Sequence, residues 1–242
     1  MEKSRIQKTQ RALALASLLV FLAIGYCSCT RIYEKSKVRT YKIQDVSRLH
    51  IKGSLDVILV PGKTTRMWVE GPADKVDNFD VKQNKSSLWL KDNLSSPTHY
   101  NIIFLGHRNE LKVYLSVPHL NYIDGEGNII IGTDTDKPLA LKKLYTRMHG
   151  NVVLEFGLLR SDSVRLDVDG NSVIKMKYIK CHYTGLKIAG NSVVKADYND
   201  CLSGRLDADD NNIITLSGTM RQKMDVHTRG NVALNNGLKY VK

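Results

Sequence analysis

Four aspartates in the second half of the chain have a spacing at which carboxylate chemistry on a polysaccharide could occur. Asp167 and Asp169 are followed forty residues later by Asp207 and Asp209. Enzymes that cleave glycosidic bonds use a pair of carboxylates, and Ca²⁺ prefers the same oxygen ligands. These residues are therefore candidates for a catalytic or cation-binding face. Lys187 lies midway between the two pairs, so a hydrated surface with internally neutralised charge is the competing interpretation.

A second group of residues combines basic and aromatic side chains. Its members are Lys175, Lys177, Lys195, Tyr178 and Tyr198. Cations beside exposed rings suit an anionic glycan, because the positive charge attracts acidic groups and the rings offer flat contact surfaces. A solvated strip with the tyrosines stacked along the fold is the alternative interpretation of the same residues.

Cys181 and Cys201 are twenty residues apart. In adjacent coils of a repeat, their Cα atoms would lie near the spacing of neighbouring strands, which a disulfide tolerates. Export would place them in an oxidising compartment. A disulfide is therefore one expectation, and a pair of free, buried thiols that act as small apolar side chains is the other.

Other kinds of chemistry lack a matching pattern. The histidines show no metal-ligand spacing, and the cysteines do not form a zinc pattern. Neither a phosphate-binding loop nor a Ser-His-Asp signature is present. We therefore expect no metal and no cofactor.

A repeat of twenty residues positions all of these side chains. Its most regular feature is an asparagine that follows a turn-forming Gly or Asp, at Asn151, Asn171, Asn191, Asn211 and Asn231. A fixed period of this length is typical of stacked-coil folds, whose single units cannot bury a core. Stacked asparagines can join their side-chain amides along the stack and so offset the cost of burial, which predicts a structural Asn ladder.

Apolar residues around each asparagine indicate the fold class. Positions three and five residues before and after it are mostly aliphatic, and this spacing of two is typical of strands with one inward face. No helical periodicity follows the first 29 residues. The sequence therefore predicts an all-β β-solenoid, specifically a right-handed parallel β-helix with coils of about 20 residues.

Charged residues support the same register. Four residues before each asparagine the side chains are Arg147, Asp167, Lys187, Asp207 and His227. Stacked strands lie about 4.8 Å apart, so these alternating charges would form a ladder of ion pairs. Like charges in the same positions would be destabilising.

The first 29 residues are predicted to be an export signal of the lipoprotein type. A basic start precedes the short apolar run 12–24, and cysteines follow it directly. The bulky Tyr26 disfavours Cys27, so Cys29 is the expected lipidated residue. An ordinary secretory signal or a single membrane anchor is the alternative. Residues 30–45 would form a tether between Cys29 and the folded domain.

The charge of the chain bears on its partners. The formal net charge is +12, of which the leader contributes +3, so +9 remains from Cys29 onward. A basic balance favours anionic partners such as lipid headgroups or acidic polysaccharide, and it is also common in exported proteins without such a partner. Export argues against nucleic acid. We expect contact with a membrane through the lipid anchor, and an anionic glycan or another envelope protein as a further partner.

Residues 46–121 are rich in strands but lack the clean period. We interpret them as irregular coils that cap the regular coils of residues 122–242, because an uncovered sheet edge invites aggregation. The two parts together form a single predicted domain over residues 46–242.

Three motifs resemble a known family. They are the strand 51–60 with Gly53-Ser54-x-Asp56-Val57, the segment 113–118 before Gly-x-Gly-Asn, and the later Gly-Asn-Ser-Val units. The chain is similar, over residues 43–240, to the auto-transporter adhesin head (GIN) domain family. The resemblance implies an exported, often lipid-anchored protein with a β-solenoid fold and no established activity. Asp210 and Asn236 depart from the repeat, which predicts a fraying last coil.

These observations give three functional hypotheses. The first is a non-enzymatic lipoprotein of the cell envelope, anchored in the outer membrane, whose solenoid surface serves adhesion or glycan binding. The second is a carbohydrate-active enzyme, a lyase or a hydrolase, that uses the aspartate face. The third is a structural component of the envelope without a small ligand.

Overall fold

The computed structural model describes residues 36–93, 111–133 and 137–241, and Ser36–Lys242 forms one compact unit. The expected leader with Cys29, and residues 30–35 of the expected tether, lie outside the described residues. The tether prediction is wrong for residues 36–41, which form the strand β1. This strand pairs antiparallel with β3, and the ring of its last residue, Tyr41, packs edge-on against Phe79.

Within the described residues the chain is almost entirely β-structure, with one short helix. The elements are β1 (Ser36–Tyr41), β2 (Arg48–Leu59), β3 (Arg66–Pro72), α2 (Ala73–Asn78), β4 (Asp80–Asn84), β5 (Ser87–Lys91), β6 (Lys112–Ser116), β7 (Tyr122–Gly132), β8 (Leu139–Phe156), β9 (Leu159–Ala189), β10 (Asn191–Cys201), β11 (Ser203–Ala208), β12 (Asn211–Met220), β13 (Asp225–Thr228), β14 (Asn231–Asn236) and β15 (Lys239–Tyr240). Helix α2 was not expected from the sequence. It spans six residues and buries only Val76.

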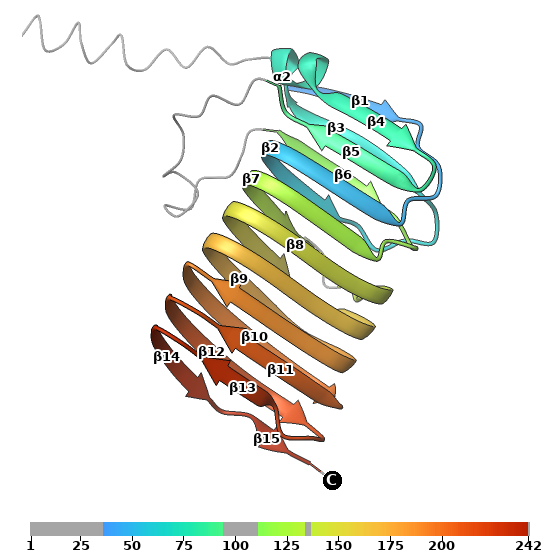
Figure 1. Cartoon of the computed structure of the whole chain (residues 1–242). Helices are drawn as coiled ribbons and strands as arrows, with labels where there is room; N and C mark the ends of the chain where they lie inside the picture. The colour runs from blue at the N-terminus through green and yellow to red at the C-terminus, as the bar shows by residue number, and fades with distance from the viewer. Residues whose placement is uncertain (1–35, 94–110, 134–136, 242) are drawn as a thin grey trace, which may run out of the picture. The chain divides into compact units, whose positions relative to one another are not determined.

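The strands stack as successive parallel coils, from β2 through β7, β8, β9, β10 and β12 to β14 (Figure 1). Residues twenty apart face each other, as Asn151 faces Asn171 and Asn191 faces Asn211. The predicted β-solenoid and its register are therefore confirmed. The corners at Gly150 and Gly170 lie inside β8 and β9, so these two strands are continuous through them, whereas the corner at Gly190 separates β9 from β10.

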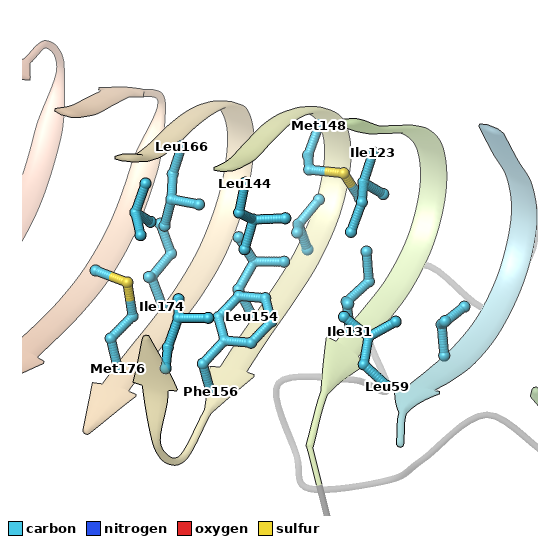
Figure 2. Close-up of a cluster of buried hydrophobic side chains, with 14 of the residues drawn as sticks. Leu59, Ile123, Ile131, Leu144, Met148, Leu154, Phe156, Leu166, Ile174 and Met176 are labelled. Atoms are coloured by element: carbon cyan, nitrogen blue, oxygen red, sulfur yellow. The ribbon is translucent and has the colours of Figure 1, made fainter. Parts of the chain in front are cut away.

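The core lies between the walls of the solenoid. Every second residue points inward, so equivalent positions of neighbouring coils fill the same layer. Leu154 stacks over Ile174 and Phe156 over Met176, and all four are buried. Figure 2 shows these side chains pointing into the interior from adjacent ribbons. Each coil thus buries its apolar face only against its neighbours.

The corners depend on glycine at one position of each coil. Gly150, Gly170 and Gly190 have φ angles of +109°, +120° and +89°, which side chains rarely tolerate. A Cβ atom on Gly170 would lie 2.3 Å from the carbonyl oxygen of Gly150. In the next coil Asp210 takes this position with φ of 70°, and its carboxylate accepts a hydrogen bond from the backbone N–H of Gly190.

An uninterrupted ladder of side-chain amides follows these corners. Each asparagine donates through Nδ2 to the Oδ1 of the asparagine one coil before it, at 3.1 Å for Asn171, 3.1 Å for Asn191 and 3.0 Å for Asn211. The ladder continues upstream, where Asn128 donates to Ser54. It differs from the expectation in one respect: the asparagines from Asn171 onward are exposed, because the corner turns them outward rather than into the core.

The regular stack begins earlier than residue 122. Strand β2 is already in parallel register with β7, so that Gly53 faces Gly127 and Ser54 faces Asn128. The remainder of the expected capping region does form a cap. β3 is antiparallel to both β1 and β6, β4 is antiparallel to β5, and β5 and β6 each pair in parallel with part of β2.

The last coil is the least covered part of the solenoid. Asn236 is exposed in the row where Phe156, Met176 and Leu216 are buried, and Leu234 is only half-buried. Fraying of this coil stays a prediction, since Asn231–Asn236 is paired with β12 along its whole length.

The corner geometry generates a testable prediction. Gly170→Ala should lower the free energy of unfolding by more than about 2 kcal/mol, because the methyl group meets the Gly150 carbonyl at a φ that alanine rarely adopts. Gly237→Ala is the matched control: its Cβ atom would approach Leu216 O only to 3.3 Å, and a change within about 0.5 kcal/mol is expected. Urea denaturation measures both. Equal effects of the two substitutions would contradict this account of the corners.

Candidate binding face

Outward side chains of the solenoid form rows that run from coil to coil. Side chains at equivalent positions of stacked strands lie side by side, so one row samples the same position of every coil. The row through the predicted charge ladder begins in the cap and contains Lys82, Trp89, His50, Asp124, Arg147, Asp167, Lys187, Asp207 and His227. We call it the charged row.

Opposite charges neutralise one another in the second half of this row. Lys187 Nζ lies 3.6 Å from Asp167 Oδ1. Asp207 accepts two hydrogen bonds from Arg205 of the adjacent row, at 2.7 Å from Nε and 2.8 Å from Nη2. These hydrogen bonds hold the pKa of Asp207 below its ordinary value, although burial opposes the effect. The alternating register is as predicted, but the main partner of Asp207 comes from a neighbouring row.

The four candidate aspartates do not converge on one site. They occupy two neighbouring rows, and each has a basic side chain beside it. The pairs are Asp167 with Lys187, Asp169 with His149, Asp207 with Arg205, and Asp209 with Arg229. In the ranges that the structure covers, no three acidic, histidine or cysteine side chains are grouped so that they could hold a metal ion. This surface therefore matches the competing interpretation, a hydrated surface whose charges neutralise one another.

Aromatic rings instead gather where the cap meets the first coils. The rings of Trp89 and His50 are stacked, with centroids 4.9 Å apart and planes 11° apart. His50 approaches Tyr122 at 6.3 Å, and Tyr122 approaches Tyr145 at 5.4 Å. Because Tyr122 and Tyr145 belong to the row beside the charged row, this chain of rings crosses the coils obliquely.

Arginines extend the chain of rings at its sides. The guanidinium carbon of Arg48 lies 5.9 Å from the centre of the Tyr122 ring, and that of Arg165 lies 5.1 Å from the Tyr183 ring. Both distances are within the range of cation–π attraction. We call the whole set the aromatic diagonal; it consists of Trp89, His50, Arg48, Tyr122, Tyr145, Arg165 and Tyr183.

The aromatic diagonal lines two surface cavities that share His50. One, of about 690 Å³, lies around Trp89 and includes Asp124 and Arg147. The other, of about 910 Å³, includes Tyr122, Tyr145 and Tyr183. Trp89 is 39% exposed, which is high for a tryptophan. Partial burial, followed by the charge of Asp124, raises the pKa of Tyr122. A tyrosine hydroxyl is protonated at neutral pH even without this shift, so it can donate a hydrogen bond.

The predicted basic and aromatic group does not form one face. Lys175 and Lys195 do stack, and Lys175 Nζ lies 2.9 Å from Glu155 Oε1. The expectation that Tyr178 and Tyr198 stack is wrong. A register shift after Ala196 sets Tyr198 opposite Ile179, so Tyr198 is buried at 2% exposure.

The other members of this predicted group point outward. Tyr178 is 56% exposed at a positive φ of 53°, and Lys177 is exposed beside it. With Tyr198 inside the core, the pair of rings that would have bound a glycan on this surface is absent from the described structure.

The two central cysteines meet inside the solenoid. Cys181 Sγ lies 2.7 Å from Cys201 Sγ, both side chains are buried, and both are thiols in the structure. The Cys201 thiol also donates to the carbonyl oxygen of Ile179 at 3.2 Å. The hydrogen bond with Cys201, together with burial, raises the pKa of the Cys181 thiol. The geometry brings the two sulfurs together, as the repeat predicts, and their oxidation stays a prediction.

The comparisons with known proteins identify the family. A family model described as "Putative auto-transporter adhesin, head GIN domain" matches residues 45–237. The chain belongs to this family. None of the curated proteins matches the chain.

Solved structures are similar to this chain at low sequence identity. A putative adhesin from Bacteroides fragilis is 12% identical over 84% of this chain and 97% of that chain, with a TM-score of 0.56. A putative adhesin from Parabacteroides distasonis is 11% identical over 84% and 98%, with a TM-score of 0.47. A putative lipid-binding protein from the same species is 16% identical over 87% and 98%, with a TM-score of 0.41.

The family description gives a coarse functional class. It is that of an adhesin head domain, so the chain is a member of an adhesin-like family, consistent with an exported protein of the cell surface or envelope. Over its described residues, no helix is long and apolar enough to cross a bilayer.

The cysteine geometry generates a second prediction. Exposure of the folded, full-length chain to a thiol–disulfide oxidant should join Cys181 to Cys201, because the sulfurs are already adjacent. The bridge closes a loop of about 20 residues and should raise the free energy of unfolding by about 3 kcal/mol. Peptide mapping by mass spectrometry without reduction detects the bond, and Cys201→Ser is the control. Two thiols that remain fully alkylatable after unfolding would show that the bridge does not form.

Proposed function

We propose that this GIN-domain protein is a non-enzymatic adhesion module that binds a glycan on the aromatic diagonal. The observation that carries the proposal is the contiguity of the rings. Trp89, His50, Tyr122 and Tyr145 come from four different strands, yet each contacts the next. The hydrophobic core does not require them there, because they lie on the outer surface.

The chemistry of the diagonal suits a sugar chain. The C–H faces of a pyranose ring are apolar, so they pack on aromatic rings, while its hydroxyl groups need donors and acceptors nearby. Both kinds of group occur here: the cavity around Trp89 also contains Asp124 and Arg147. Aromatic and arginine side chains are the residues that most often dominate binding energy at interfaces.

The enzymatic alternative has less support from the same residues. Its candidate carboxylates are already engaged by His149, Lys187, Arg205 and Arg229, whereas glycoside hydrolysis needs two carboxyl groups facing the bond that breaks. The third hypothesis, a scaffold without a ligand, gives no reason for exposing a stacked tryptophan at the surface.

The export signal supports the location that we propose. Cys29 follows a leader of the lipoprotein type, so acylation there would anchor the protein in the envelope membrane, with the outer membrane as the proposed site. A surface-anchored solenoid with a glycan-binding face would hold a cell against a polysaccharide. Another envelope protein is the alternative partner for the same face.

The proposed function can be tested with one tyrosine pair. Tyr145→Ala should lower the affinity for glycans on a microarray at least tenfold. We expect the stacking of one aromatic ring on one sugar ring to contribute about 1.4 kcal/mol or more, which corresponds to this factor. Tyr178→Ala is the matched control, since it removes an exposed tyrosine from a different surface. Thermal unfolding checks that both variants fold.

Two results would count against the proposal. One is binding of the unchanged protein to no glycan on the array. The other is an equal loss for Tyr145→Ala and Tyr178→Ala, which would point to a non-specific contact.

A further inference from the structure

We infer that the glycan on the aromatic diagonal is acidic, and that it lies across the coils with its negative groups bound by Arg48 and Arg165. This inference rests on the proposed function and adds the ligand class, the direction of the sugar chain and its minimum length. Two observations support it: the order of residues along one row of the solenoid, and the contacts that the two arginines of that row make.

The row beside the charged row has an arginine at each end of a tyrosine pair. Arg48 faces Tyr122, Tyr122 faces Tyr145, and Tyr145 faces Arg165, each in direct register with the next. Both arginines are exposed, and both tyrosines are half-buried. The row therefore presents a flat aromatic centre with a guanidinium group on either side.

These two arginines differ from Lys187 and Arg205 on the same face. Lys187 is paired with Asp167, and Arg205 with Asp207. Arg48 and Arg165 form no ion pair with any carboxylate in the described part of the chain; each lies against a tyrosine ring instead. A guanidinium held over a ring keeps its hydrogen-bond donors free, and its planar fork matches a carboxylate or sulfate group.

The spacing of the row sets the length of the ligand. Neighbouring coils lie about 4.8 Å apart, so Arg48 and Arg165, three coils apart, are separated by about 14 Å. A disaccharide is too short to reach both arginines while it covers the tyrosines, whereas an extended tetrasaccharide spans the row. Its acidic groups at the two ends would meet the arginines, and its central rings would stack on Tyr122 and Tyr145.

The charge of the remaining chain favours the same ligand class. A formal net charge of +9 from Cys29 onward draws acidic polymers toward the protein before contact. Attraction of this kind weakens as salt rises, whereas stacking on the tyrosines does not. Salt dependence thus separates the arginine contribution from the tyrosine contribution.

Calorimetric titration of the full-length protein with defined oligosaccharides tests the inference. The probes are di- and tetrasaccharides of polygalacturonate, alginate and hyaluronan, with the methyl esters of the same tetrasaccharides as uncharged counterparts. At least one acidic tetrasaccharide should bind ten times more tightly than its ester and than its disaccharide. Arg48→Gln and Arg165→Gln should each weaken that binding about tenfold.

Two further variants control for the effect of charge. Arg165→Lys keeps the charge and should retain part of the affinity, whereas Lys195→Gln removes an exposed charge from another surface and should change nothing. If no acidic tetrasaccharide binds better than its ester, or if the arginine variants bind normally, the inference is overturned. Binding of esters that still depends on Tyr145 would leave the proposed function standing, and absence of any Tyr145-dependent binding would overturn both.

Discussion

The close approach of stacked backbones at the Gly-Asn corners is the constraint on which the rest of the structure depends. Gly170 passes so near Gly150 that no side chain fits between them, and the following asparagines are joined by amide hydrogen bonds. Each amide both donates and accepts, so a slip of one residue would leave polar groups unpaired along the whole ladder. The corners therefore fix the register of every coil at once.

A fixed register turns single positions of the sequence into continuous surfaces. Inward positions become the apolar layers of the core, and outward positions become rows with a definite chemical character. The aromatic diagonal exists only because β5, β2, β7 and β8 are held in one register by hydrogen bonds of the sheet. Binding chemistry in this fold is thus a property of rows across coils rather than of any loop or motif.

The sequence predicts the fold well because its repeat is exact where the coils are regular. Asn151 to Asn231 recur at one interval, and that interval determines the stacking. The diagonal was not predicted because most of its rings lie outside this interval: Tyr122 and Tyr145 are separated by 23 residues, and Trp89 belongs to the cap. The nearest signal was Gly53-Ser54, which repeats Gly127-Asn128 with serine in place of asparagine.

Local departures from the repeat explain the other differences. A register shift after Ala196 places Tyr198 in the core, whereas the repeat predicts it at the surface. Such a shift is visible only in the pairing of the strands. Strand β1 has little apolar character, and its partner β3 lies some thirty residues further along the chain. The sequence predicted the alternating order of charges in the charged row. It did not predict that Asp207 accepts its hydrogen bond from Arg205, two residues earlier in the same strand.

The central claim is that hydrogen-bonded asparagine amides hold the coils in register. NMR spectroscopy of the isotope-labelled, full-length protein tests it through couplings that cross hydrogen bonds. Correlations should link Nδ2 of Asn191 to the side-chain carboxamide carbon of Asn171, and Nδ2 of Asn211 to that of Asn191. If a folded protein lacks these correlations, or if they join asparagines that do not lie in adjacent coils, the account is contradicted.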